Sequence, residues 1–281
     1  MSDGGCVGSR FLHPASEISH PKFPFMIHPT AIVSPEAKIG ADVFIGPYCR
    51  IGDRVTIGNR CRFESHVIVE GPTTIGENNR FFPFGTIGLQ PQDLKFKGED
   101  TRLTIGSDNV FREYVNIHRG TQGGGGHTVI GNHNFLMVYS HVAHDCWLGS
   151  HIIMANAATL AGHVTVEDHA TIGAFSGVHQ FCRIGTHGYV GGYSVITKDV
   201  LPYSKTVSER NTQAFGVNTI GLERKGFTPE QLRNIKVAFR LLIQSKLNTT
   251  QALEAIEAQI QSPEVQVLVD FIKSSSRGVI K

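Results

Sequence analysis

The fold is decided by a stretch that reads IGADVFIGPYCRIGDRVTIG at residues 39–58. Isoleucine stands at every sixth position, as Ile39, Ile45, Ile51 and Ile57, and a glycine follows each of them. Four residues after each isoleucine comes a valine or a cysteine. Two inward positions in every six residues, with turn-permissive glycine between them, are typical of a parallel β-helix.

The period of six extends far beyond this stretch. Aliphatic or aromatic residues mark it over residues 27–87, again in the same phase over 105–117, and over 130–196 after a slip of one residue. In solenoids, insertions form loops on one face, and that face is often the functional one. The two breaks therefore predict functional loops, near 89–104 and 119–129.

Three regions are expected along the chain. Residues 1–25 show no period and predict a flexible N-terminal extension, with Met26 as a sensible natural start. The β-helix is expected over 26–203 and a C-terminal helical domain over 204–281. In the latter, Thr228-Pro-Glu-Gln231 has the sequence of a capped helix start, with proline at the first helical position and a capping-box glutamine.

Composition narrows the class of protein. The chain has 281 residues, of which 40% are hydrophobic, so it is long and apolar enough to form a hydrophobic core. Its net charge of only +2 does not indicate a nucleic-acid-binding protein. The sequence contains no apolar run of about 18 residues, so no transmembrane helix is expected. Residues 1–25 lack the apolar core of a secretory signal. We expect a cytoplasmic protein without stable membrane insertion.

The cysteines are expected to be structural. Their number is odd and no CxxC pair exists, which argues against zinc clusters and a disulfide framework. Four of the five, Cys49, Cys61, Cys146 and Cys182, occupy the small inward position of the repeat. These four are expected to be buried thiols that pack as small hydrophobic residues.

Histidines gather on one edge of the predicted prism. Val142, Leu160 and Val178 are 18 residues apart, which is one triangular coil, so their segments should stack on one face. The polar residues that follow this face, or stand beside it, are His118, His141, His144, Asp145, His163, His179 and Gln180. Both predicted loops leave from the same side. Two independent features thus indicate a functional site at this edge.

The residue types at this edge favour acid–base chemistry. A neutral His144 could act as general base, with the carboxylate of Asp145 orienting its ring. Gly162, one coil along, could bring a backbone N–H close to a developing oxyanion. No serine or cysteine nucleophile stands out, which favours direct transfer to an acceptor. Two alternatives stay open at this point: a metal enzyme of the β-helical carbonic-anhydrase type, and a non-catalytic trimeric scaffold.

Five motifs in this order resemble one family, the acyl-[acyl-carrier-protein]–UDP-N-acetylglucosamine O-acyltransferases. They are Gln92-Asp-Leu-Lys95, Ile117-His-Arg-Gly120, His141-Val-Ala-His-Asp-Cys146, Leu160-Ala-Gly-His163 and Val178-His-Gln-Phe-Cys182. The resemblance implies a left-handed parallel β-helix of hexapeptide repeats with a C-terminal α-helical domain. It also implies a homotrimer with active sites between subunits. The sister N-acyltransferase carries a separate uridine-binding domain before its repeats, for which 25 residues are too few.

The resemblance also implies an activity: transfer of an (R)-3-hydroxyacyl chain from acyl carrier protein to the 3-hydroxyl of UDP-N-acetylglucosamine, the first step of lipid A biosynthesis. By matching motif, His144 would be the general base, Asp145 its orienting partner and Gly162 the oxyanion donor. The residues that would hold the sugar nucleotide and the acyl chain are Asp93, Lys95, His118, His141, His163, His179 and Gln180.

For the donor, the resemblance implies an acyl chain carried on the phosphopantetheine of acyl carrier protein, and no further cofactor. Asn218 and Arg224 would contact the pantetheine arm or its phosphate, and Gly192 would set the acyl length. A glycine there leaves the groove long, so a fourteen-carbon chain is expected. Because the carrier is acidic, a basic docking surface is expected, with a solvated charged face as the alternative; the candidates are Lys198, Lys205, Arg210, Arg224 and Lys225.

Overall fold

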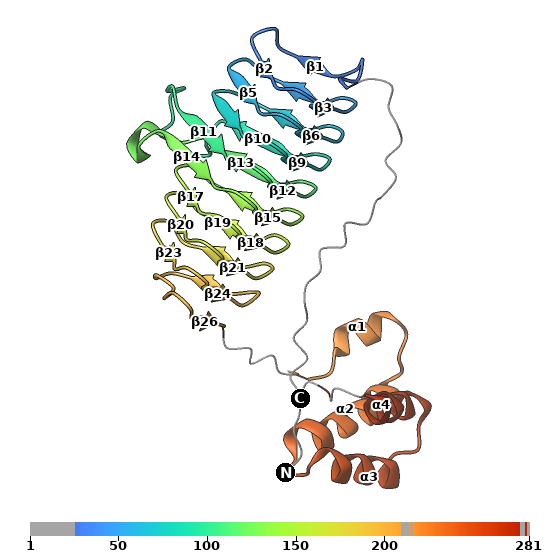
Figure 1. The fold of residues 1–281 in the computed structure, drawn as a ribbon. Coiled ribbons are helices and arrows are strands. Elements are labelled where there is room, and N and C mark those ends of the chain that lie inside the picture. Colours follow the sequence, from blue (N-terminus) through green and yellow to red (C-terminus); the bar gives the residue numbers. More distant parts are fainter. Residues whose placement is uncertain (1–25, 209–213, 215, 276–278, 280–281) are drawn as a thin grey trace, which may run out of the picture. The chain divides into compact units, whose positions relative to one another are not determined.

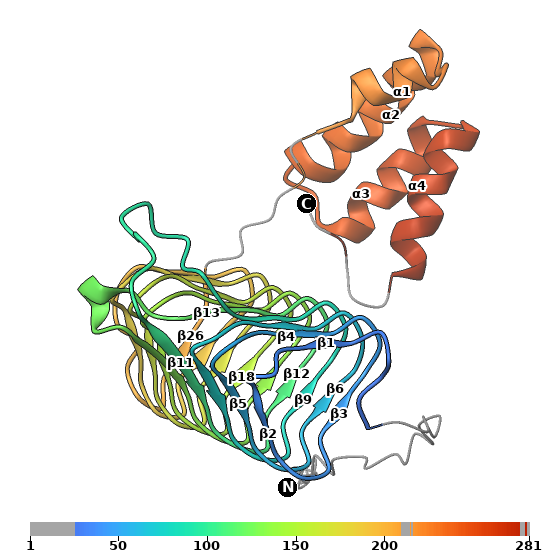
Figure 2. The same cartoon turned by 90° about the horizontal axis from the view of Figure 1, so that it is seen from above.

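The computed structural model describes residues 26–208, 214, 216–275 and 279. The chain divides into two compact units, residues 1–208 and 209–281. The first contains a β-helix and the second a group of helices (Figures 1 and 2). Each unit is described by itself.

The β-helix is built from three parallel sheets whose short strands follow one another in rotation. The first sheet contains β1 (Ile32–Val33), β4 (Arg50–Ile51), β7 (Ile68–Val69), β10 (Thr86–Leu89), β13 (Asn116–His118), β16 (His141–Val142), β19 (Thr159–Leu160), β22 (Gly177–Val178) and β25 (Val195–Ile196). The second contains β2 (Lys38–Ile39), β5 (Val55–Ile57), β8 (Thr73–Ile75), β11 (Arg102–Ile105), β14 (His127–Ile130), β17 (Trp147–Leu148), β20 (Thr165–Val166) and β23 (Arg183–Ile184). The third contains β3 (Phe44–Ile45), β6 (Arg62–Phe63), β9 (Arg80–Phe81), β12 (Val110–Phe111), β15 (Phe135–Leu136), β18 (Ile153–Met154), β21 (Thr171–Ile172), β24 (Tyr189–Val190) and β26 (Lys205–Thr206).

The predicted stacking of the marker residues is confirmed. In the first sheet Ile117 pairs with Val142, Val142 with Leu160, and Leu160 with Val178. These side chains point inward and are almost fully buried. Buried apolar surface stabilises a protein by roughly 25 cal/mol per Å², so the core that runs along the prism axis is the main source of its stability.

Aromatic residues take over the core of the third sheet for part of its length. The rings of Phe63, Phe81 and Phe111 stack on one another with centroids 4.6 and 4.7 Å apart. All three are at most 1% exposed. Stacking at the inter-strand spacing fixes the register of neighbouring coils, since a slip of one residue would turn each ring outward.

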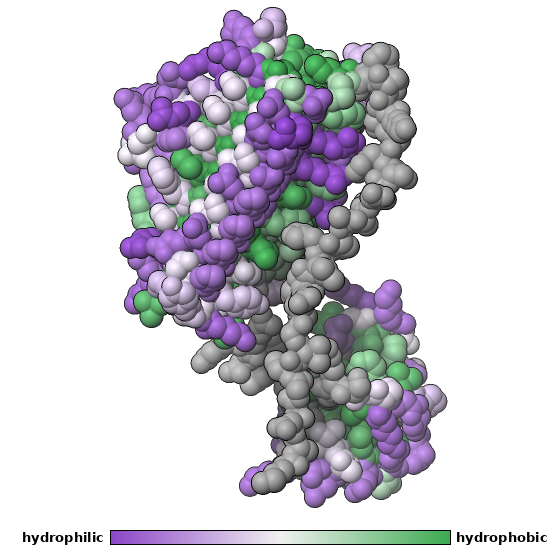
Figure 3. All heavy atoms as spheres, viewed as in Figure 1, coloured by the Kyte–Doolittle hydropathy of each residue, from purple (hydrophilic) through white to green (hydrophobic). Residues whose placement is uncertain are grey.

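The four repeat cysteines are buried, as expected. Burial raises the pKa of the Cys146 thiol to about 12. Outward positions are mostly polar, and hydrophilic residues cover much of the face of the β-helix seen in Figure 3. Cys6 lies outside the described residues.

The two loops leave the prism at the same corner, between the first and second sheets (Figure 2). The first loop joins β10 to β11, and the second joins β13 to β14 and contains the short 3-10 helix η1 (Gln122–Gly124). Both had been expected at these places from the breaks in the period.

The β-helix continues beyond the expected boundary at residue 203. β26 (Lys205–Thr206) pairs with β24 in the third sheet, and the compact unit ends at Ser208. The polar sequence after Pro202 hides this strand, because Thr206, which pairs with the buried Val190, stands where the repeat would have an apolar marker.

The second unit consists of α1 (Thr219–Arg224), α2 (Pro229–Phe239), the π-helical turn η2 (Arg240–Gln244), α3 (Thr249–Gln259) and α4 (Pro263–Ser274). The expected capping box is present: Thr228 Oγ1 accepts from the N–H of Gln231, and the side chain of Gln231 accepts from the N–H of Thr228. None of the helices in the described part of the chain combines the length and apolar character that crossing a membrane requires.

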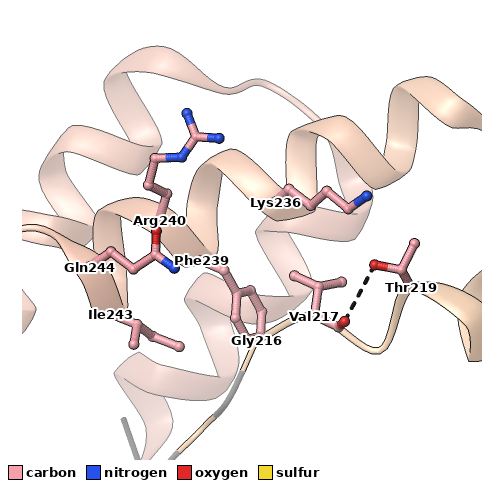
Figure 4. A pocket seen from close by; sticks show the side chains of 8 residues that line it. All are labelled: Gly216, Val217, Thr219, Lys236, Phe239, Arg240, Ile243 and Gln244. Carbon is pink, nitrogen blue, oxygen red and sulfur yellow. Dashed lines mark hydrogen bonds between the residues drawn. The ribbon is translucent and has the colours of Figure 1, made fainter.

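A pocket of about 220 Å³ lies within this unit, between residues 216–219 and the helices α2 and η2 (Figure 4). Val217, Phe239 and Ile243 give it apolar walls, and Lys236 and Arg240 add positive charge. Two of its lining residues, Val217 and Thr219, flank Asn218 in the sequence, but no predicted site residue lines the pocket.

Candidate active site

Four neighbouring strands of the first sheet bring the histidines together. β13, β16, β19 and β22 are adjacent in the sheet, and Asn116 pairs with His141 across the first two. His118 ends β13, and His144, His163 and His179 stand at or near the carboxyl ends of the following three strands. The structure thus brings these histidines to one edge of the first sheet, as the spacing of 18 residues predicts.

The centre of this edge is the pair formed by His144 and Asp145. Nδ1 of His144 donates to Oδ2 of Asp145 over 2.8 Å. The Asp145 carboxylate is 1% exposed and also accepts from the N–H and the hydroxyl of Thr121. An ionised carboxylate only accepts hydrogen bonds, so the imidazole hydrogen lies on Nδ1. Nε2 of His144 therefore carries the lone pair that a general base needs.

Gly162 provides the space for this imidazole. A Cβ added at Gly162 would lie 2.6 Å from Cε1 and 2.9 Å from Nε2 of His144. Any larger residue at this position would displace the ring. The backbone of Gly162 thus lies directly beside the nitrogen that would take the proton.

His118 and His141 are held as neutral imidazoles. Their rings meet edge to face with centroids 5.1 Å apart, and Nδ1 of His141 is 2.7 Å from Oδ1 of Asn116. Burial lowers the pKa of His118 to about 4, with a smaller effect from the positive charge that His141 would carry. Burial also lowers the pKa of His141. Among the described residues, Nδ1 of His118 is buried without a hydrogen-bond partner.

The first loop carries Asp93 and Lys95. Oδ1 of Asp93 accepts from the N–H of Lys95 over 2.9 Å, which leaves the Lys95 side chain exposed. Two residues that the sequence analysis did not single out anchor this loop: the guanidinium of Arg119 lies 5.5 Å from the centre of the Phe96 ring, and it donates to the carbonyl of Gly88 over 3.0 Å.

The other edge residues continue along the next coils. The His163 ring stacks on Phe181 at 4.5 Å, and its Nε2 is 3.9 Å from Oδ2 of Asp145. His179 and Gln180 are exposed, with Nδ1 of His179 3.2 Å from the Gln180 carbonyl oxygen. They follow β22, which lies two strands from β16 in the first sheet.

Gly192 lies apart from this group in the β-helix, and two further predicted residues, Asn218 and Arg224, belong to the second unit. Gly192 lies in the corner that precedes β25, at the opposite edge of the first sheet from the histidines. Asn218 caps α1, where its side chain accepts from the N–H of Gly221, and Arg224 ends the same helix in the second unit. Of the expected basic surface, Lys198 and Lys205 belong to the first unit and Lys225 to the second, and Arg210 lies outside the described residues.

The chemistry available here is that of a base rather than a nucleophile. Cys146, next to Asp145, is buried, points inward and donates to the carbonyl of Ala161, so its thiol is withheld from the edge. His144, Asp145 and His163 offer ligand atoms within 4.8 Å of one another. However, Nδ1 of His144 and Oδ2 of Asp145 are already bonded to each other. This pairing favours the orientation of a base over the chelation of a metal.

Comparisons with known proteins define the class first. Residues 36–71 match the family described as bacterial transferase hexapeptide, six repeats. Residues 199–280 match the second domain of UDP-N-acetylglucosamine O-acyltransferases. The fold is thus that of a hexapeptide-repeat transferase.

Full-length relatives then define the family. An acyl-[acyl-carrier-protein]–UDP-N-acetylglucosamine O-acyltransferase from Halorhodospira halophila is 49% identical over 256 residues, covering 91% of this chain and 99% of the relative. One from Thermodesulfovibrio yellowstonii is 48% identical with the same coverage. The solved structure of LpxA from Acinetobacter baumannii is 45% identical, with a TM-score of 0.65 over 92% of this chain and 100% of that one. The chain belongs to the acyl-[acyl-carrier-protein]–UDP-N-acetylglucosamine O-acyltransferase family.

This membership confirms the family that the five motifs indicated, and with it a mainly β fold of hexapeptide repeats followed by a helical region. It does not favour the metal enzyme or the non-catalytic scaffold.

Proposed function

We propose that this protein transfers an (R)-3-hydroxyacyl chain from acyl carrier protein to the 3-hydroxyl of UDP-N-acetylglucosamine, the first step of lipid A biosynthesis. The observation that carries the proposal is the His144–Asp145 pair, whose hydrogen bond engages Nδ1 of His144 and leaves Nε2 for proton transfer. Family membership supports the choice of substrates.

In the proposed reaction, Nε2 of His144 takes the proton of the sugar 3-hydroxyl as the oxygen attacks the thioester carbonyl carbon. A C–O bond forms, and the negative charge moves to the carbonyl oxygen. When the tetrahedral intermediate collapses, the C–S bond breaks and His144 returns the proton to the departing pantetheine thiolate. The Asp145 carboxylate stabilises the imidazolium between these steps. No covalent enzyme intermediate and no cofactor are needed.

Gly162 is proposed to donate its backbone N–H to the oxyanion, and its closeness to His144 supports this role. Asp93, Lys95, His118, His141, His163, His179 and Gln180 are proposed to hold the sugar nucleotide and the acyl chain. The neutral imidazoles of His118 and His141 suit sugar hydroxyls, because each can accept a hydrogen bond at one nitrogen. Lys95 suits a phosphate as an exposed point charge.

We propose a homotrimer whose sites lie between subunits. The position of Gly192 supports this arrangement, because within one chain it lies across the first sheet from His144. If Gly192 sets the acyl length, a second copy must bring it to the histidines. A long chain, of the fourteen-carbon kind, is the proposed donor, since glycine fills none of the groove.

The proposed donor contacts are Asn218 and Arg224, and the proposed location of the reaction is the cytoplasm. Acyl carrier protein is acidic, and Lys198, Lys205, Arg210, Arg224 and Lys225 are proposed to attract it.

The test is an acyl-transfer assay with 3-hydroxytetradecanoyl carrier protein and UDP-N-acetylglucosamine. The wild type should form the 3-O-acyl product, and His144→Ala should lose nearly all activity. His133→Ala is the matched control, because His133 is an exposed histidine at another corner of the prism. The absence of product with the wild type across chain lengths, or full activity in His144→Ala, would contradict the proposal.

A further inference from the structure

The second loop wraps around the catalytic carboxylate. Immediately after β13 the chain passes close to the Asp145 side chain. The enclosure is tight: a Cβ added at Gly124 would lie 2.1 Å from Cγ of Asp145, and one added at Gly120 would lie 2.7 Å from Oδ1. Glycines at these two positions let the loop backbone approach the carboxylate closely.

Thr121 makes the polar contacts of this enclosure. Its N–H is 2.9 Å from Oδ1 and 3.1 Å from Oδ2 of Asp145, and its hydroxyl donates to Oδ2 over 2.6 Å. Thr121 is 6% exposed, so water does not compete for these bonds. The hydroxyl and Nδ1 of His144 both donate to the same oxygen, Oδ2.

Two donors at one oxygen define how the carboxylate is turned. Asp145 can rotate about its Cβ–Cγ bond, and each rotation changes which lone pair faces His144. The Thr121 hydroxyl holds Oδ2, which also accepts from Nδ1 of His144, and the Thr121 N–H contacts both carboxylate oxygens.

We propose that Thr121 is a positioning residue for the transfer reaction: it fixes the Asp145 carboxylate, and thereby the Nδ1-protonated tautomer of His144. The proposal rests on the proposed function for its kinetic consequence, but not for its effect on the tautomer. The hydroxyl of Thr121 bonds to Asp145, so we expect Thr121 to act on His144 through that carboxylate.

The first experiment measures the tautomer and does not depend on activity. With ¹⁵N-labelled histidine, NMR correlation of ring nitrogens and carbon-bound hydrogens distinguishes the two tautomers, and His144→Gln assigns the signal. In the wild type we expect Nδ1–H at His144. In Thr121→Val, which keeps the side-chain shape but removes the hydroxyl, we expect a mixture. A spectrum of Thr121→Val that matches the wild type would overturn the proposal.

The second experiment measures the kinetic consequence. Loss of a hydrogen bond to a charged group predicts a fall in kcat of roughly tenfold to a hundredfold for Thr121→Val. The KM for the sugar nucleotide should stay within about twofold, and Thr121→Ser should restore most of the activity because it restores the hydroxyl. A loss expressed only in KM, or no rescue by serine, would overturn the positioning role.

Thr101→Val is the matched control. Thr101 is 2% exposed, and among the described residues its hydroxyl has no hydrogen-bond partner. The same substitution there should leave both the tautomer and kcat unchanged. If Thr121→Val does not fold, Gly124→Ala is the second variant. Its added methyl group must push against Asp145 and so disturb the position of the carboxylate. A wild-type kcat in Gly124→Ala would contradict the proposal. An inactive wild type with the expected tautomer would count against the proposed function alone.

Discussion

His144 illustrates how much of an active residue is decided by its neighbours. The neutral imidazole can carry its proton on either of two nitrogens, and the contact with Asp145 selects Nδ1. The next coil leaves room for the ring, because Gly162 has no side chain at this point. At the scale of single residues, function here depends on partners one coil away.

One prediction at this scale concerns pH. Folding holds the pKa of His118 at about 4, against an ordinary value of 6.5. Below pH 6.5 the unfolded chain therefore binds a proton that the folded one does not bind until about pH 4. The free energy of unfolding should therefore fall as the pH falls through this window, by about 2 kcal/mol between pH 7 and pH 5. In urea unfolding at both pH values, His118→Asn should lose less stability than the wild type. Equal losses in the two proteins would contradict this assignment.

Sequence reasoning found the adjacent pair His144–Asp145 because its members are neighbours in the chain. It did not single out Thr121, which is 24 residues from Asp145 and reaches it only through the turn at η1. A glycine-rich loop predicts that its backbone lies close to another group, but the glycine pattern does not identify the Asp145 carboxylate as that group.

At the scale of elements, the coil is the unit on which the fold depends. Each coil contributes one strand to every sheet, and a column of like side chains joins it to the next. The fold could be predicted because the inward positions recur at a fixed period that survives both loops. β26 was missed for the same reason, since it carries no apolar marker.

The aromatic column gives a prediction at this scale. Phe81 lies between Phe63 and Phe111 and is 1% exposed, so Phe81→Ala should leave a cavity and cost about 3–5 kcal/mol of unfolding free energy. Phe84→Ala is the matched control, because this ring stacks at an outer corner and is 45% exposed. Chemical denaturation of both variants measures the difference. Similar losses for the two would show that outer stacking contributes as much as the core column.

At the scale of the whole molecule, the chain joins a β-helix, which contains the proposed base His144, to a helical unit, which contains Asn218 and Arg224. The sequence identified both sets of residues by their resemblance to a family. The repeat by itself predicts only the first set, because the period ends before the helices begin. The repeat likewise does not predict the role of Gly192 within the β-helix, because that role requires another copy of the chain.

The basic residues give a prediction at this scale. Attraction between exposed charges is screened over about 8–10 Å at moderate ionic strength. Raising NaCl from about 50 mM to about 500 mM should therefore lower kcat/KM for the acyl carrier protein donor severalfold. A small acyl-phosphopantetheine donor without the protein is the control and should respond less. Lys205→Glu should weaken use of the carrier and reduce its salt dependence. Rates that ignore ionic strength would count against this surface.

The repetition of coils has a mechanical consequence. Each coil of 18 residues pairs only with the coils before and after it, as Ile32 with Arg50 and Arg50 with Ile68. A force applied at the Ile27 end would meet no strand that ties distant coils together, so the prism should come apart one coil at a time. Each step would release about 60 Å of extended chain. The histidine edge, several coils further in, would stay intact until the force had peeled the chain back to it.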